Sequence, residues 1–205
     1  MCSLRMEKGL FLLMVVLLMM ASTWAALAAQ REPAKWHCRT TVSQYRHDIN
    51  AYRAKYGKTA GEARFFAECK PVRTVKRDGN LLLQEGVTSI WSLLIGGTET
   101  AFDNANARIG VGDSTTAAAD SDTGLQAATN VAYAVMDTGY PQLGAAADKK
   151  VIFRGTFGAA AANFAWAEWT VDNGAAAAKN LNRKVESLGT KSGGTWMITV
   201  EISLS

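Results

Sequence analysis

The run from Thr195 to Leu204 is the part of the sequence that most restricts the possible folds of this chain. In this run large apolar residues alternate with polar ones, so an extended backbone gathers Trp196, Ile198, Val200, Ile202 and Leu204 on one side. Met197 is the one apolar residue on the other side. A strand with one apolar face needs a second surface to bury it, and the apolar runs 151–157 and 164–171 supply one. The sequence therefore predicts an antiparallel β core.

The size and charge of the chain fit one well-buried domain with a smaller appendage. The chain has 205 residues, 48% of them hydrophobic, which suffices for one sizeable core. Residues 1–79 carry 14 Lys and Arg against 6 Asp and Glu, whereas residues 80–205 carry 8 against 12. A basic segment can lie against anionic lipid, nucleic acid or an acidic protein. Because these basic residues are dispersed, we interpret them as a solvated surface and predict no nucleic-acid partner.

Residues 1–29 are ordered like a secretory signal. Two basic residues precede an apolar run at 9–21, and small residues with the Ala-x-Ala pattern follow, which predicts cleavage near Ala28 or Ala29. Left uncut, residues 9–29 are just long enough to anchor the chain in a bilayer, and this is the one membrane contact expected. Five of the seven Met residues lie in the first twenty positions, so a start codon downstream of Met1 is a third interpretation.

Residues 30–77 are predicted to form a small basic segment of helical or mixed structure. Aromatic and aliphatic residues recur at helical spacing from Tyr45 to Tyr56, and Gly57 is expected to end this helix. A second short helix is expected over residues 61–69.

Cys38 and Cys69 lie in the same segment, beyond the leader. Together with His37 and His47 they offer the side chains that zinc prefers, but the segment has no Cys-x-x-Cys knuckle, so no metal site is predicted. In an exported protein the better use of the two cysteines is a Cys38–Cys69 disulfide. In the cytoplasm both are expected to be free thiols.

Residues 78–205 are predicted to form the β domain, with one helix packed against it. Asn80 is placed to cap a helix whose apolar face contains Leu83, Val87, Ile90 and Leu94, and we expect this face to cover the sheet. Alternating apolar residues predict strands at 107–112, 131–135, 151–157, 164–171 and 195–204, and 181–189 is expected to be a short strand or turn. The fold class expected is an antiparallel, jelly-roll-like β-sandwich.

The run 164–171 changes face partway, which requires either two buried faces or a β-bulge near Glu168. A carboxylate between aromatic side chains is typical of a sugar site, so Trp166, Glu168 and Trp169 form the candidate ligand surface. A glycosidase needs a second carboxylate opposite the first, and the sequence indicates none. The other interpretation is that Glu168 pairs with Arg154 or Arg183 within the sheet.

Catalytic and cofactor motifs are missing from the C-terminal part of the sequence. Residues 80–205 contain no His and no Cys, which removes Ser-His-Asp and Cys-His catalysis from this region. The pattern Gly110-x-Gly112 has no third glycine, no lysine and no following helix, so it does not predict a phosphate-binding loop. We therefore predict no enzymatic activity and no cofactor.

A series of short motifs runs through residues 76–205. They are Gly79-Asn-Leu-Leu-Leu, Trp91-Ser-Leu-Leu-Ile-Gly-Gly, Phe102-Asp-Asn-Ala-Asn-Ala-Arg-Ile-Gly-Val-Gly-Asp-Ser-Thr, Gly124-Leu-Gln, Met136-Asp-Thr-Gly-Tyr-Pro, Phe164-Ala-Trp-Ala-Glu-Trp, Leu181-Asn-Arg and Leu188-Gly-Thr-Lys. This series resembles small virion proteins of tailed bacteriophages and prophages, and its Ile-Gly-Val-Gly-Asp stretch is similar to the opening domains of phage tail-fibre proteins. The resemblance implies a β-rich, oligomeric assembly subunit of a capsid or tail that has no assigned activity.

The expected function is thus a non-enzymatic structural protein of a phage or prophage particle, tail- or capsid-associated. Its expected partners are other virion proteins and further copies of itself, assembled in the bacterial cytoplasm. The export signal departs from this pattern, because virion parts assemble without export. The alternative is an exported module at the periplasm or cell surface that binds carbohydrate or mediates adhesion through Trp166, Glu168 and Trp169.

Overall fold

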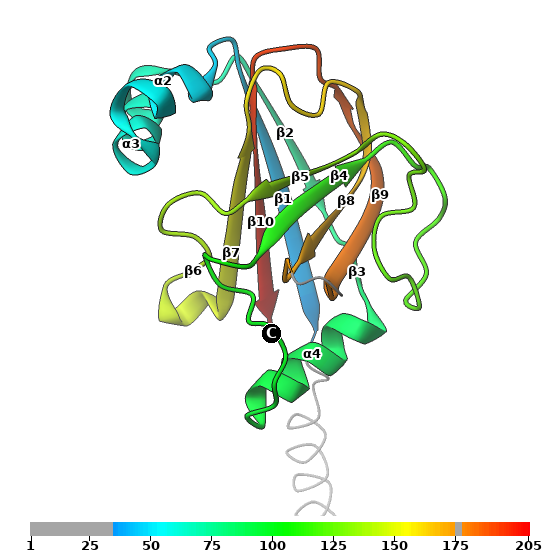
Figure 1. Ribbon diagram of the computed structural model, residues 1–205. Helices are drawn as coiled ribbons and strands as arrows, with labels where there is room; N and C mark the ends of the chain where they lie inside the picture. Colours follow the sequence, from blue (N-terminus) through cyan, green and yellow to red (C-terminus); the bar gives the residue numbers. More distant parts are fainter. Residues whose placement is uncertain (1–34, 175–177) are drawn as a thin grey trace, which may run out of the picture. The chain divides into compact units, whose positions relative to one another are not determined.

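The computed structural model describes residues 35–174 and 178–205 (Figure 1). Residues Trp36–Ser205 form one compact unit, which contains every described helix and strand. The predicted signal peptide or anchor at residues 1–29 lies outside the described residues. Within the described ranges, no helix is long and apolar enough to span a membrane.

The described part of the chain is mainly β, with two antiparallel five-stranded sheets and three α-helices. Sheet A has the order β2-β1-β10-β7-β6, with β1 (Trp36–Tyr45), β2 (Arg73–Asp78), β6 (Gln142–Leu143), β7 (Lys150–Phe157) and β10 (Thr195–Leu204). Sheet B has the order β3-β9-β8-β4-β5, with β3 (Leu81–Leu82), β4 (Arg108–Gly112), β5 (Val131–Val135), β8 (Ala165–Asp172) and β9 (Asn180–Thr190). The helices are α2 (Ile49–Tyr56), α3 (Lys58–Glu68) and α4 (Gln84–Leu94), and a 3-10 turn covers Ala146–Asp148.

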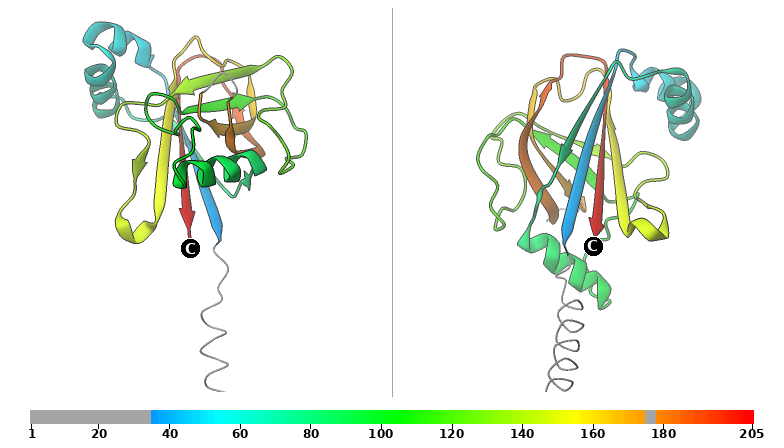
Figure 2. Two further views of the ribbon diagram at one scale, coloured as in Figure 1. Left: turned by 60° about the horizontal axis from the view of Figure 1, so that its bottom comes forward. Right: turned by 180° about the vertical axis from the view of Figure 1, so that it is seen from behind.

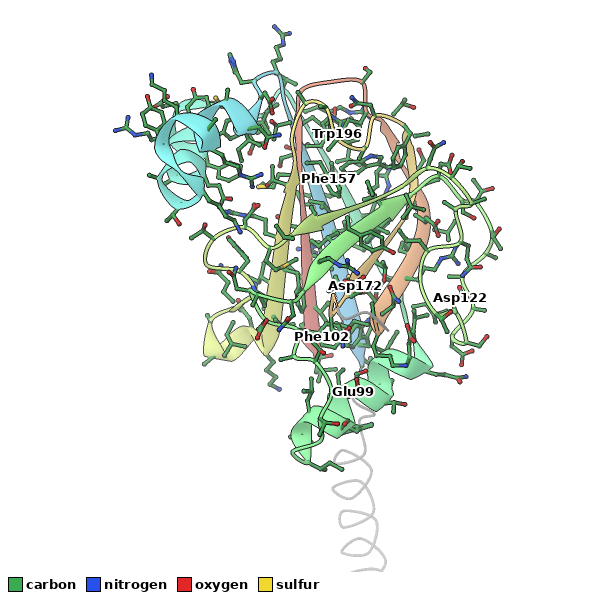
Figure 3. All side chains as sticks on the ribbon, viewed as in Figure 1. Glu99, Phe102, Asp122, Phe157, Asp172 and Trp196 are labelled. Atoms are coloured by element: carbon green, nitrogen blue, oxygen red, sulfur yellow. The ribbon has the colours of Figure 1, made fainter. Side chains whose placement is uncertain are left out.

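The two sheets pack on each other around one apolar core. A single cluster of buried residues contains Trp196, Ile198, Val200 and Ile202 of β10 together with Trp166 and Trp169 of β8. Phe157 and Trp196 lie at one end of this core and Phe102 lies at the other (Figure 3). The antiparallel β core predicted from the alternation in β10 is confirmed, and β10 has the predicted bounds.

Strand β1 is part of the core and not of a separate appendage. It pairs with β10 along its whole length, from Trp36 opposite Leu204 to Tyr45 opposite Thr195, and β2 pairs along its other edge. The domain boundary expected at residue 78 is therefore wrong, because the two-sheet unit already begins at Trp36. Of the predicted appendage, the helical pair α2 and α3 remains.

Helices α2 and α3 and the end of β1 form a second, smaller apolar cluster of Tyr45, Ile49, Phe65 and Cys69. Met197, the residue that breaks the alternation of β10, packs against this cluster. The first helix begins at Ile49 rather than at Tyr45, because Asp48 caps it by accepting a hydrogen bond from the backbone N–H of Asn50 (3.1 Å). It ends at Gly57, as predicted.

The predicted Cys38–Cys69 disulfide is wrong, since both thiols are free and buried in different clusters. Cys38 lies near the start of β1, whereas Cys69 follows α3 and is close to the other end of β1, where Val72 bonds to Gln44. Six residues of strand separate Cys38 from Gln44, a distance of about 20 Å. A disulfide requires the two Cα atoms to lie within about 7 Å, so no local adjustment can join them.

Burial of Cys38 leads to a prediction on the pH dependence of stability. Burial raises the pKa of the Cys38 thiol from 9.0 to about 12. Between these values the folded chain keeps a proton that the unfolded chain loses, so this group lowers stability as pH rises above 9.0. We expect the free energy of unfolding to fall more steeply above pH 9.0 in the native chain than in Cys38→Ala, by up to about 1.4 kcal/mol per pH unit. Urea unfolding at a series of pH values measures the two slopes, and equal slopes would show that the folded thiol ionises normally.

Helix α4 lies across one end of the two-sheet core, as two views agree (Figures 1 and 2). Gly86 packs directly on the backbone of Leu181 in β9, where a Cβ would collide with the Leu181 carbonyl. The expected cap, Asn80, instead accepts a hydrogen bond from the indole N–H of Trp36 (2.7 Å), and the helix begins after Leu83 without a side-chain cap.

The expectation that α4 buries its apolar face is wrong for half of that face, and Val87 is half-buried. Leu83, just before the helix, is buried, but within the helix the buried residues are Gly86 and Ser89. Ile90 and Leu94 are exposed. The helix therefore buries only small residues fully and leaves Ile90, Trp91 and Leu94 exposed.

Candidate interaction site

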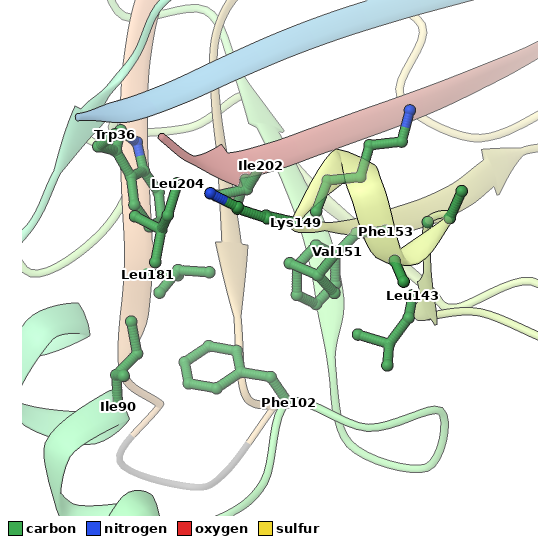
Figure 4. Close-up of a pocket in the computed structure, with 14 residues that line it drawn as sticks. Trp36, Ile90, Phe102, Leu143, Lys149, Val151, Phe153, Leu181, Ile202 and Leu204 are labelled. Atoms are coloured by element: carbon green, nitrogen blue, oxygen red, sulfur yellow. The ribbon is translucent and has the colours of Figure 1, made fainter. Parts of the chain in front are cut away.

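A groove of about 480 Å³ opens between the sheets at the end of the core next to α4 (Figure 4). Both sheets, α4 and the loops between them contribute to its walls. The large apolar side chains that line it are Trp36, Ile90, Phe102, Leu143, Val151, Phe153, Leu181, Ile202 and Leu204. The groove continues the apolar core at this end, where the two sheets do not cover it.

The exposed face of α4 extends this apolar surface outward. Ile90 both lines the groove and belongs to the helix, and the neighbouring Trp91, Leu94 and Ile95 are 58%, 71% and 83% exposed. At the groove itself Leu143 is 83% exposed and Leu204 is 53% exposed. Large apolar side chains that gather in this way on a protein surface mark an interaction site.

Two lysines give the groove a basic rim. Lys150 is paired with Glu201 (3.1 Å) and Asp148 (3.2 Å), and hydrogen bonds to these carboxylates raise the pKa of Lys150. Lys149 has no ion-pair partner among the described residues, and its ammonium lies beside Leu204 (Figure 4). The two lysines and the two carboxylates balance in charge, and Lys149 is the lysine of the rim that no described carboxylate pairs with.

The groove and the exposed face of α4 are suited to binding an apolar partner. The described residues that line the groove supply no carboxylate, imidazole or thiol. Covering Trp91, Leu94 and Ile95 with an apolar partner would contribute about 1.5–3 kcal/mol for each side chain fully buried. The site can therefore hold an apolar segment and orient an acidic group at Lys149.

The ligand surface predicted at Trp166, Glu168 and Trp169 is wrong, because all three residues are fully buried. Trp166 packs between Phe157 and Trp196 in edge-to-face contacts, with both ring centroids 4.9 Å from its own. The indole N–H of Trp166 donates to the Ala162 carbonyl (2.9 Å) and that of Trp169 donates to the Thr40 hydroxyl (3.0 Å). The two tryptophans are satisfied core residues and present no face to a sugar.

Glu168 forms a buried ion pair with Arg183, which was the other interpretation of the sequence. The pairing of β8 with β9 shifts register between Trp166 and Glu168, which is the bulge expected there. The carboxylate lies 2.7 Å from the Arg183 guanidinium, and neither side chain is exposed. The carboxylate also accepts hydrogen bonds from the backbone N–H groups of Gln126 and Ala127. The carboxylate of Glu168 therefore has all of its hydrogen-bonding partners within the folded chain.

Arg183 also ties down the long loop between β4 and β5. Its guanidinium pairs with Asp122 (2.7 Å) and donates to the Thr116 carbonyl (3.0 Å). The loop thereby covers the outer side of sheet B above Glu168. Within residues 35–174 and 178–205, no group of three or more His, Cys, Asp or Glu side chains is arranged to hold a metal ion.

The residues of the candidate site that the sequence does not reveal are apolar residues that are exposed in the structure. The run Trp91 to Ile95 holds four large apolar residues in five positions, which is wider than one buried helix stripe. This excess was a signal that part of α4 faces outward. Leu143 gives no comparable signal, because it is a single large aliphatic residue followed by glycine and alanines.

Comparison of the chain with protein-family models, with curated proteins and with solved structures finds no match.

Proposed function

We propose that this chain is a non-enzymatic structural protein of a phage or prophage particle, tail- or capsid-associated, that acts through protein–protein assembly. The observation that carries the proposal is the apolar groove joined to the exposed residues of α4. The resemblance of residues 76–205 to small phage virion proteins supplies the setting. In this proposal the two sheets form a jelly-roll-like β-sandwich, and the chain resides in the assembled particle.

The proposed occupant of the groove is an apolar segment of a neighbouring virion protein that carries an acidic residue. The apolar walls and the exposed side chains of α4 match an apolar segment, and the unpaired ammonium of Lys149 matches a carboxylate. Interfaces of this kind bury aromatic anchors at the centre and keep charges at the rim. Trp91 is the expected anchor on this side.

Trp91→Ala is expected to weaken docking onto particles by about thirtyfold, since truncating an aromatic anchor at an interface costs about 2 kcal/mol or more. The measurement titrates the purified full chain onto particles produced without this gene and determines the dissociation constant. Val72→Ala is the matched control, because Val72 and Trp91 are both 58% exposed and Val72 is not part of the groove. Its affinity should stay within about twofold of the native value.

Two results would contradict the proposal. If Trp91→Ala and Val72→Ala bind equally well, the groove and α4 do not form the docking surface. If the native chain is neither present in purified particles nor able to bind particles that lack it, the chain is not a virion protein.

A further inference from the structure

Strand β5 is an open edge of sheet B. It pairs with β4 over all five of its residues, and in the described part of the chain no strand runs along its other side. This pairing ends at Val135 opposite Arg108, and the next residue, Met136, forms an isolated bridge with Gly155 of β7. In Figure 1 the strand crosses the front of the molecule next to β4. An open edge presents backbone donors and acceptors that can pair with another chain.

The other open edges of the two sheets are protected and β5 is not. Proteins protect edge strands by keeping them very short or by placing charges on them. Among the described strands, β3 and β6 have two residues each, and β2 carries four charged residues in six. Strand β5 has five residues without a charge or a proline. It is therefore the edge best suited to accept a further strand.

The sequence of β5 is also a palindrome, Val-Ala-Tyr-Ala-Val. Two copies that pair antiparallel about Tyr133 place Val131 opposite Val135, Ala132 opposite Ala134 and Tyr133 opposite Tyr133. A twofold interface requires such self-complementarity, because each residue meets its counterpart in both directions. Opposed β-branched side chains and opposed aromatic side chains also stabilise sheet pairs.

The side chains of β5 leave its open edge accessible. Val131, Tyr133 and Val135 are 36%, 41% and 58% exposed on the outer face of the sheet. The ring of Tyr133 lies over Gly110 of β4, where a Cβ would come within 2.5 Å of the ring, and the guanidinium of Arg108 stacks on it at 4.6 Å. The ring thus packs on its own sheet and does not cover the backbone at the edge.

We infer that β5 pairs with β5 of a second copy of this chain, antiparallel about Tyr133, so that the two five-stranded B sheets become one continuous sheet. The inference rests on the proposed function in that it names one partner of the assembly subunit. It uses a surface distinct from the groove and α4, so the two can be tested separately.

The test places charges at the two ends of the strand in the full chain, kept in mild detergent so that the apolar run 9–29 does not bring copies together. The native chain is expected to sediment as a dimer. V131K/V135K sets lysine opposite lysine in this register, and we expect its dimer dissociation constant to rise by about a hundredfold. V131K/V135E sets lysine opposite glutamate, and its dimer is expected to re-form. Both positions are exposed, so the three proteins should have the same melting temperature when each is measured as a monomer, at a concentration below its dimer dissociation constant.

A native chain that stays monomeric at high concentration would overturn the inference, as would a V131K/V135K variant that dimerises normally. A monomeric V131K/V135E variant would overturn the register about Tyr133. Trp91→Ala should leave the dimer intact, so that failure of particle docking and failure of β5 pairing are read from different variants.

Discussion

Glu168→Gln is expected to lower the free energy of unfolding by about 3–5 kcal/mol, because it breaks a buried ion pair while keeping the volume of the side chain. The guanidinium of Arg183 then loses its fully buried partner and keeps the partly exposed Asp122. The new amide also replaces an acceptor of the backbone N–H groups of Gln126 and Ala127 by a weaker one. Urea unfolding of the full chain measures the loss.

Asp78→Asn is the matched control for this prediction. It removes one charge from the Arg39–Asp78 pair, whose side chains are 62% and 75% exposed. An exposed pair contributes at most about 1 kcal/mol, so the control should unfold close to the native midpoint. If the two variants shift the midpoint equally, the pair between Glu168 and Arg183 is solvated in solution, and the interpretation of Glu168 as a structural residue fails.

Trp166→Ala is expected to cost about 3–5 kcal/mol of stability, as is usual for truncating a large aromatic side chain in a core. Trp166 is fully buried between Phe157 and Trp196, so its removal leaves a cavity that neither β7 nor β10 can fill without moving. Trp91→Ala, with the same change in chemistry at an exposed position, is expected to change stability by less than about 0.5 kcal/mol.

Variants of these two tryptophans test stability and assembly separately. Thermal unfolding should distinguish Trp166→Ala from the native chain, and particle docking should distinguish Trp91→Ala. A stable Trp166→Ala variant would mean that the two sheets do not close around this side chain, and the groove at the opposite end of the core would then need a different explanation.

The strands of the core could be predicted where apolar side chains alternate without interruption. Strand β10 was predicted with its observed bounds, and β5 was predicted correctly, because in both the alternation extends over the whole strand. In strand β1 the alternation is interrupted, because the polar residues Thr40 and Gln44 occupy inward positions. Their burial depends on partners such as Trp169, whose indole bonds to Thr40, and sequence spacing does not show such partners.

The candidate sites could not be predicted in the same way, because exposure is a property of the whole fold. Glu168 between Trp166 and Trp169 has the composition of a sugar site, and a bulge together with Arg183 turns it into a buried structural pair. Conversely, α4 has the apolar pattern of a covering helix. Its packing through Gly86 leaves Ile90 and Leu94 outside.

The pairing of β1 with β10 also determines when this domain can fold during protein synthesis. Tyr45 at the end of β1 lies opposite Thr195 at the start of β10, so the whole of the intervening chain must be made before the middle of sheet A can form. Contacts between such distant segments fold slowly. Until then the edge of β1 that later pairs with β10 has unpaired backbone groups, and a chaperone has the longest opportunity to bind there.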